Sequence, residues 1–238
     1  MLKKISAVKS TQSLAEYTEK MVAALAHEIR NPLNSMKGAA EFLSEKYAGT
    51  AEVKEFSGII LSEIKRVENY LNEFLSFSRG VKLKLGPVNL KNFITGIIMT
   101  VKHGFPYEIG VDADKADCDV ELDSEQIRQV LVNLLSNARD AVREALPAEP
   151  LVVVSACLRG KKVLLTVKDN GSGMKPGVKK NIFVPFFTTR EDGMGIGLSV
   201  CRSVVQRHKG RIKIKTKPGA GSSFTVELPL RQKMVKNA

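Results

Sequence analysis

A seven-residue repeat of apolar side chains between residues 51 and 78 constrains the fold of this chain more than any other feature. The repeat consists of Val53, Ile60, Val67 and Phe74, with Ile64 and Leu71 at the complementary heptad position and Phe56 close by. A seam of this kind requires a partner helix. The segment from Ser13 to about Tyr47 supplies one, because its apolar residues recur mostly at three- and four-residue steps. With the turn Ala48-Gly49-Thr50 between them, the two segments predict an antiparallel helical hairpin.

An isolated hairpin leaves much apolar surface exposed, so the hairpin is expected to find a further partner. Two copies that pair as a dimeric four-helix bundle satisfy this requirement. The alternative is that the hairpin packs on the C-terminal part of its own chain. In either case residues 1–80 form one predicted domain and residues 81–238 a second.

The second domain mixes helices and strands. Helices are expected over residues 89–103, 124–146 and 195–208, and strands over residues 107–111, 118–122, 151–158, 163–168, 211–216 and 224–228. Several strands with helices on one side predict a two-layer α/β sandwich. The overall expectation is therefore an α-helical hairpin followed by an α/β domain.

Composition excludes several classes of protein. The 238 residues are 43% hydrophobic and 26% charged, which is typical of a globular chain. No run approaches the roughly 20 apolar residues of a membrane helix. The three cysteines are far apart, without paired metal-ligand spacing, and are expected to be reduced thiols in a cytoplasmic protein. The net charge of +12 is spread over the surface and favours nucleotide phosphates or an acidic partner protein, with nucleic-acid binding a minor alternative.

One short stretch of the first helix carries reactive side chains. His27, Glu28 and Asn31 lie directly before Pro32, which is expected to bend the helix. His27 follows Leu25 by two positions, about 200° further round the helix at ~3.6 residues per turn, so it should face solvent rather than the apolar stripe. A surface histidine beside a glutamate is also a common feature without function. Only the remaining sequence decides whether His27 is a reactive histidine or an ordinary surface histidine.

Three further patterns point to a nucleotide. Asp169 to Met174 is a glycine-rich segment after a strand, which by itself is also compatible with an ordinary turn. Gly193 to Leu198 opens a helix, where backbone amides can approach phosphate. Asn133 and Asn137 are four residues apart and share a helix face. These two amides are either hydrogen-bonded core neighbours or oxygen ligands of Mg²⁺.

The order and spacing of these motifs resemble those of two-component sensor histidine kinases. Residues 27–33 are similar to the H box, 133–138 to the N box, 169–173 to the first glycine box, 183–189 to the F box and 193–197 to the second glycine box. The last strands, with Gly210 to Ile214 and Pro218 to Phe224, are also similar. The resemblance covers about Ala15 to Pro229.

The resemblance implies an ATP-dependent protein-histidine kinase. His27 would take the γ-phosphoryl group, and Glu28 would orient the ring and accept its proton. Asn133 and Asn137 would hold Mg²⁺ and the phosphates, and Asp169 would accept a hydrogen bond from the adenine amino group. The full set of residues expected to bind ATP is Asn133, Asn137, Asp169, Gly171, Gly173, Phe187, Thr188, Gly193, Gly195, Gly197, Leu198 and Ser222.

The same resemblance implies partners. A homodimer and a response regulator that receives the phosphoryl group on an aspartate are expected, with the signal arriving from a sensing domain or from another protein. Asn31 lies one turn after His27, where an amide in this family is associated with dephosphorylating the regulator; alternatively it only leads the helix into Pro32. Two departures stand out: only Arg190-Glu191-Asp192 separates Thr189 from Gly193, and Met194 replaces a frequent threonine.

Overall fold

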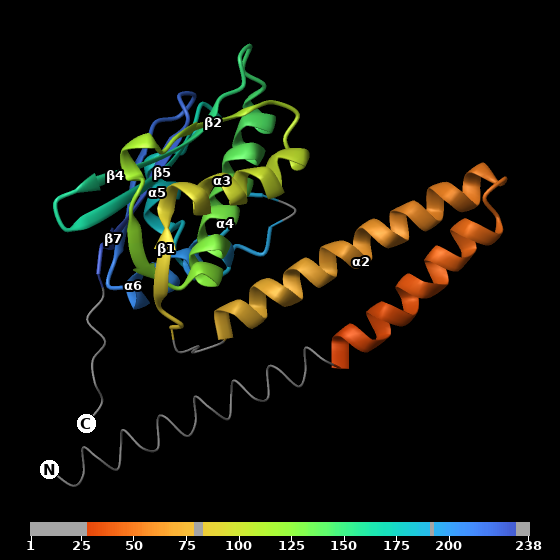
Figure 1. Ribbon diagram of the computed structural model, residues 1–238. Helices are drawn as coiled ribbons and strands as arrows, with labels where there is room; N and C mark the ends of the chain where they lie inside the picture. The colour runs from red at the N-terminus through yellow and green to blue at the C-terminus, as the bar shows by residue number, and fades with distance from the viewer. Residues whose placement is uncertain (1–27, 79–82, 191–192, 232–238) are drawn as a thin grey trace, which may run out of the picture. The chain divides into compact units, whose positions relative to one another are not determined.

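The computed structural model describes residues 28–78, 83–190 and 193–231, and its contacts divide the chain into the units Met1–Val81 and Lys82–Ala238 (Figure 1). The first unit is a helical hairpin and the second an α/β domain. Among the helices of the described residues, none is both long and apolar enough to cross a membrane. Each unit is considered by itself below.

The hairpin consists of a helix over residues 28–46, a turn, and helix α2 (Ala51–Ser78). The first helix continues through Pro32 without interruption of its helical assignment. Among the hairpin side chains that the structure describes, the buried ones form one seam of seven-residue spacing: Leu33 and Ala40 of the first helix and Ser57, Ile64 and Leu71 of α2. By contrast, Ile60 and Val67 are 44% and 38% exposed. The predicted heptad pattern of α2 therefore separates into two rows. The inner row (Ser57, Ile64 and Leu71) is buried within the chain, and the outer row (Ile60 and Val67) is exposed.

Strands of the α/β domain form two sheets. A small antiparallel pair joins β1 (Gly86–Asn89) to β3 (Asp119–Leu122). The main sheet has the order β2-β4-β5-β7-β6, with bounds Ile109–Asp112, Val152–Arg159, Lys162–Asp169, Ser222–Pro229 and Arg211–Thr216. Its pairs are antiparallel except β2 with β4, which run parallel.

Helices cover one face of this sheet, as the second layer of the sandwich (Figure 1). Helices α4 (Ser124–Ala145) and α6 (Gly197–Arg207) contact its strands, and α3 (Leu90–Val101) packs on α4. Strand residues alternate between buried and more exposed positions, as the two-residue period of a sheet covered on one side requires. The buried strand residues are Val152, Val154, Ala156, Val163, Leu165, Val167, Phe224, Val226 and Leu228. The two-layer α/β fold expected from the sequence is thereby confirmed.

Several element boundaries follow from local chemistry. Asn89 caps α3 by accepting a hydrogen bond from the Asn92 backbone amide. Helix α4 ends at Leu146, which adopts a left-handed conformation, directly before Pro147. The sequence did not predict α5 (Pro176–Asn181), a six-residue helix with proline at its start. Such a short helix has too few residues for an apolar period to be recognised.

A buried histidine joins the end of α6 to the start of α4. His208 is fully buried; its Nε2 accepts the backbone N–H of Asp123 at 3.0 Å, and its Nδ1 lies 2.8 Å from the Val204 carbonyl oxygen. Both contacts are satisfied only by the neutral ring with the proton on Nδ1. Burial lowers the pKa of His208 below its ordinary value of 6.5, and Arg207 acts in the same direction, against the Val204 bond and Asp123.

This arrangement predicts acid sensitivity of the α/β domain. Because the folded-state pKa of His208 is depressed, the unfolded chain binds the proton more readily, so the contribution of His208 is complete above about pH 6.5 and is lost as pH falls toward the folded pKa. Chemical denaturation between pH 7.5 and 5 should show a falling free energy of unfolding. His208→Gln should flatten this slope, whereas the exposed His103→Gln should leave it unchanged. Equal slopes in all three proteins would contradict the assignment.

Candidate nucleotide site

Helix α4 presents a row of polar side chains toward the segment before α6. Asn133, Asn137 and Asp140 are spaced by four and three residues and so share one face. The side-chain amide of Asn133 donates to the Gly197 carbonyl oxygen at 3.3 Å. This bond uses the nitrogen of the amide, so its oxygen is directed elsewhere and can accept. Within the described residues the side chain of Asn137 makes no hydrogen bond.

Asp169 ends strand β5 and is only 3% exposed. Its Oδ1 accepts two backbone N–H groups, from Gly171 at 2.9 Å and from Ser222 at 3.1 Å. Burial raises the pKa of Asp169 above its ordinary value, and the two hydrogen bonds only partly oppose this effect. Because both donors reach the same oxygen, the second oxygen, Oδ2, stays available to accept a proton from a ligand.

The glycines beside Asp169 are required by close backbone packing. A Cβ on Gly171 would lie 2.4 Å from the Ala141 carbonyl carbon, and one on Gly173 would lie 2.0 Å from the Lys217 carbonyl oxygen. Gly173 also has a φ of +64°, in the region that favours glycine. A side chain at either glycine is therefore excluded, at Gly171 by α4 and at Gly173 by the β6–β7 turn.

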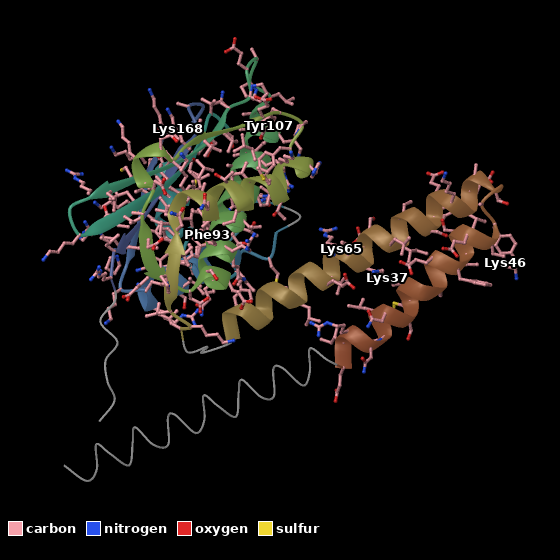
Figure 2. The ribbon with its side chains drawn as sticks, in the orientation of Figure 1. Lys37, Lys46, Lys65, Phe93, Tyr107 and Lys168 are labelled. Carbon is pink, nitrogen blue, oxygen red and sulfur yellow. The ribbon has the colours of Figure 1, made fainter. Side chains whose placement is uncertain are left out.

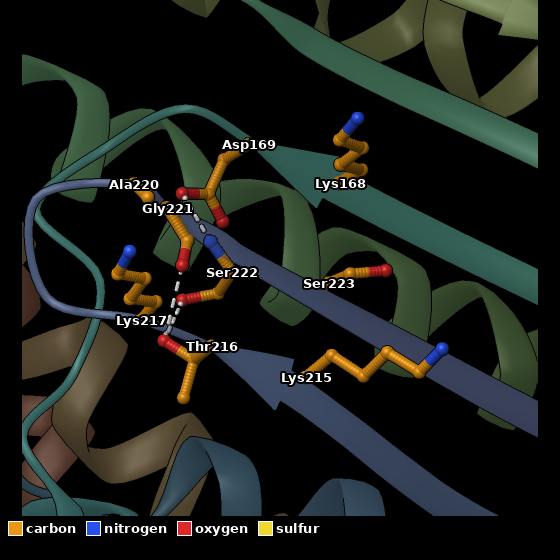
Figure 3. A pocket seen from close by; sticks show the side chains of 9 residues that line it. All are labelled: Lys168, Asp169, Lys215, Thr216, Lys217, Ala220, Gly221, Ser222 and Ser223. Carbon is orange, nitrogen blue, oxygen red and sulfur yellow. Dashed lines mark hydrogen bonds between the residues drawn. The ribbon is translucent and has the colours of Figure 1, made fainter.

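A pocket of about 270 Å³ opens around the end of β5 (Figure 3). Thr216 lies at its floor, where its hydroxyl bonds the Gly221 carbonyl oxygen at 3.1 Å and the Ser222 hydroxyl at 3.0 Å. The lining residues are Lys168, Asp169, Lys215, Thr216, Lys217, Ala220, Gly221, Ser222 and Ser223. Lys168 extends into solvent in both views (Figures 2 and 3). The lining thus includes three exposed lysines and the buried carboxylate of Asp169.

The F box packs directly on the second glycine box. The Phe186 N–H donates to the Gly195 carbonyl oxygen at 3.1 Å, and a Cβ on Gly195 would lie 2.6 Å from the Phe187 carbonyl oxygen. A Cβ on Gly193 would lie 3.2 Å from the Thr188 hydroxyl. Leu198 follows in the first turn of α6. The F box and the second glycine box are therefore in contact, and Gly197 joins the second glycine box to Asn133.

Two charged residues next to these two boxes were not singled out from the sequence. The buried Asp140 of α4 forms an ion pair with Arg190, which follows the F box. Asp140 lies three residues after Asn137, so the shared helix face is the signal that was available. Its partner lies 50 residues away in the sequence, which no local pattern reveals.

His27 of the hairpin lies outside the described residues. Glu28 and Asn31 are described, and both side chains are exposed on the first helix. The backbone carbonyl of Asn31 accepts the Ser35 hydroxyl at 3.3 Å, within the same helix. Among the described residues no cluster of three or more histidine, cysteine or acidic side chains is arranged to hold a metal ion.

A helical hairpin joined to an α/β domain with a polar helix face and glycine-rich turns defines a two-part, nucleotide-binding class of protein. Comparison with known families gives the same division. Residues 18–81 match the His Kinase A (phospho-acceptor) domain, and residues 122–232 match the "Histidine kinase-, DNA gyrase B-, and HSP90-like ATPase".

Curated relatives narrow the class further. The chain is 33% identical over 214 residues to the sensor histidine kinase ZraS of Salmonella typhi, an alignment that covers 88% of this chain and 45% of that protein. It is 32% identical over 218 residues to sporulation kinase C of Bacillus subtilis (strain 168), covering 90% of this chain and 49% of that one. The chain belongs to the two-component sensor histidine kinases and contains their catalytic core; it spans about half the length of the curated relatives it matches.

Solved structures agree with this assignment. Histidine kinase ThkA, crystallised in complex with the response regulator protein TrrA, is 27% identical with a TM-score of 0.66, covering 96% of this chain and 66% of that chain. The isolated catalytic domain of ThkA is 28% identical with a TM-score of 0.55, covering 62% and 96%. Full-length ShkA in complex with AMPPNP shares the fold, with a TM-score of 0.76 at 24% identity over 92% of this chain and 47% of that one.

Proposed function

We propose that this chain is an ATP-dependent protein-histidine kinase that phosphorylates its own His27 and passes the phosphoryl group to an aspartate of a response regulator. The observation that carries the proposal is the pairing of a phosphoacceptor hairpin with a domain whose buried Asp169 keeps one carboxylate oxygen available beside glycine-rich turns. The relative ThkA, crystallised with a response regulator, supports the second step. A non-enzymatic phosphotransfer protein is not favoured, because the nucleotide motifs are intact.

Asp169 and Ser222 are assigned to the adenine base. The available Oδ2 of Asp169 accepts a hydrogen bond from the adenine amino group, which guanine lacks at that position. Phosphates are assigned to the opposite side of the site, where Gly193, Gly195 and Gly197 lie beside Asn133. Helix α6 begins at Gly197, and a helix N-terminus favours an anion.

In the chemical step the lone pair of one His27 ring nitrogen attacks the γ-phosphorus. The bond from that phosphorus to the β,γ-bridging oxygen breaks, and ADP leaves with the electron pair. Formation of the N–P bond makes the ring cationic, so the other ring nitrogen gives its proton to Glu28. The ring is therefore neutral before and after the transfer.

A divalent cation fits the donor set on α4. The Asn133 oxygen is left over from the bond that its nitrogen makes to Gly197, and the Asn137 amide has no competing partner among the described residues. Amide oxygens together with phosphate oxygens are suitable ligands for Mg²⁺. Bound there, Mg²⁺ would offset phosphate charge during transfer.

We further propose that the protein works as a homodimer in the cytoplasm, where ATP and the response regulator are found, and that it receives its signal from a sensing domain or partner protein. Asn31 extends the proposal to dephosphorylation of the regulator. Its side chain is exposed and follows His27 by four residues in the sequence, the spacing of about one helical turn, so it could hold a water molecule there.

Labelling with γ-³²P-ATP and Mg²⁺ tests the kinase activity. The unsubstituted chain should acquire label that is stable in base and labile in acid, as phosphohistidine is, and His27→Ala should abolish it. His103→Ala, which replaces an exposed histidine of the α/β domain, is the matched control and should label normally. Label that persists in His27→Ala would contradict the assignment.

A further inference from the structure

The two faces of the main sheet carry different residues. Helices α4 and α6 pack on the face that holds the buried strand residues, such as Val167 and Phe224 (Figure 1). The next residue along each strand points to the opposite face, here called the open face, because successive side chains alternate. On the open face Lys168, Ser223 and Lys215 are direct cross-strand neighbours on β5, β7 and β6, and each is at least partly exposed (Figure 3). A row of polar side chains therefore crosses three strands.

The cations of the open face outnumber its carboxylates. Neither Lys168 nor Lys215 forms an ion pair within the part of the chain that the structure describes. Further along β6, Lys213 and Arg211 also point to the open face, and both pair with the same buried carboxylate, that of Glu227. Four cations against one anion leave this part of the sheet with three excess positive charges. The open face is therefore suited to an anionic partner.

The other side chains of the open face distinguish between kinds of anionic partner. On β4, β5, β6 and β7 none of its positions is aromatic, so it offers no ring on which a nucleobase can stack. Its large apolar side chains, Val153 and Leu164, are only partly exposed, which is unlike the protruding apolar residues that enter a bilayer. Hydroxyl groups lie beside the cations instead: those of Thr166 and Thr225 are 3.0 Å apart, and that of Ser223 lies in the next row. Ammonium and hydroxyl donors together suit carboxylates.

We infer that the open face binds an acidic segment of a partner protein, with Lys168 and Lys215 on its carboxylates and the Ser223 hydroxyl donating between them. Charge complementarity is the basis, since the face has excess positive charge and the whole chain has a net charge of +12. Two strand spacings, about 9.5 Å, separate the backbones at the two lysines, and carboxylates on one side of an extended segment are about 7 Å apart. Flexible lysine side chains accommodate this difference. Asp169 follows Lys168 and points to the opposite face, so the segment and the nucleotide bind without competing.

Fluorescence anisotropy of the whole chain with a labelled peptide tests this inference. Every second residue of the peptide is glutamate, and a peptide with glutamine in those places should not bind. Lys168→Glu/Lys215→Glu should weaken binding of the glutamate peptide by about tenfold or more at low ionic strength, because two attractions become two repulsions. Ser223→Ala changes no charge and should weaken binding by about threefold or more, through loss of one hydrogen bond to a carboxylate. The matched control, Lys102→Glu/Arg143→Glu, makes the same change in net charge at exposed positions after α3 and on α4, and should alter binding by less than about twofold.

If Lys168→Glu/Lys215→Glu fails to fold, Lys168→Gln/Lys215→Gln removes the two charges without adding repulsion and should weaken binding by about threefold or more. Equal weakening in the charge-reversed variant and its control, or full affinity in Ser223→Ala, would reduce the contact to attraction by net charge and overturn the inference. Tighter binding of single-stranded oligothymidylate or of phosphatidylserine vesicles than of the peptide would overturn it in favour of nucleic acid or membrane. Displacement of the peptide by saturating ADP would assign the lysines to the nucleotide site instead. Label that persists in His27→Ala would overturn the proposed function alone, because peptide binding does not depend on phosphorylation.

Discussion

Asp169→Asn is expected to lower the affinity for ADP by about a hundredfold or more without unfolding the α/β domain. The Asn carbonyl oxygen can still accept the Gly171 and Ser222 N–H groups that now reach Oδ1 of Asp169. The amide nitrogen then takes the place of Oδ2 and offers a proton donor to the adenine amino group, which is itself a donor. Sites built around a specific hydrogen bond discriminate strongly when that bond cannot form.

The stability of this variant should move in the opposite direction from its affinity. Burial raises the folded-state pKa of Asp169, so the ionised carboxylate lowers the free energy of unfolding at neutral pH. This cost disappears as pH falls through the folded pKa, because the folded state takes up the proton before the unfolded state does. Asparagine carries no charge, so the melting temperature of the Asp169→Asn variant at pH 7 should equal or exceed that of the unsubstituted chain.

Two measurements check the prediction: calorimetric titration with ADP and thermal unfolding followed by circular dichroism. Titration with IDP adds a sharper test, because its six-position carbonyl accepts the proton that Asn offers, so the preference for ADP over IDP should shrink or invert. Asp112→Asn, at an exposed position of the edge strand β2, is the control for loss of one carboxylate. Unchanged ADP affinity in Asp169→Asn would remove this residue from the base site.

The sequence was most informative where a local period decides the structure. Strands β4, β5 and β7 and helix α3 lie where the sequence placed strands and a helix. Contacts between segments that are far apart in the sequence could not be predicted from it. Nothing near His208 indicates that its ring accepts the N–H of Asp123, because the interaction appears only when α6 packs beside α4.

The glycines illustrate the same division between local and distant information. Their clustering identified both turns, and the resemblance assigned them to a nucleotide. The structure gives Gly171 a different reason, since a Cβ there would overlap the backbone of α4 at Ala141. A sequence pattern therefore locates such glycines, whereas the neighbour that excludes a side chain comes from elsewhere in the fold.

The heptad repeat of α2 shows what a period leaves undecided. Seven-residue spacing required a partner helix but did not say which residues meet the hairpin's own first helix and which meet a second chain. Burial within one chain now separates them: Ile64 and Leu71 are 5% and 7% exposed, whereas Ile60 is 44% exposed. Because Ile60 lies one turn before Ile64, neighbouring positions of one helix have different roles.

This separation predicts different outcomes for the same substitution at adjacent turns. Ile64→Asp buries an unpaired carboxylate inside the hairpin and should destabilise it by about 3 kcal/mol or more, with loss of helical circular dichroism. Ile60→Asp leaves the inner row intact and places a charge on the outer row. If two hairpins pair through that row, it should weaken dimerisation by about a hundredfold or more while helicity is kept.

Light scattering and sedimentation across a range of protein concentrations, each with a far-ultraviolet spectrum, distinguish the two effects. Lys54→Asp, an exposed position of α2, is the control and should stay dimeric and helical. An Ile60→Asp chain that is still dimeric at micromolar concentration would place the dimer contact on another face. An Ile64→Asp chain that dissociates with its helicity intact would show that the row buried within one chain belongs to the dimer, because a charge inside the hairpin cannot leave both helices undisturbed.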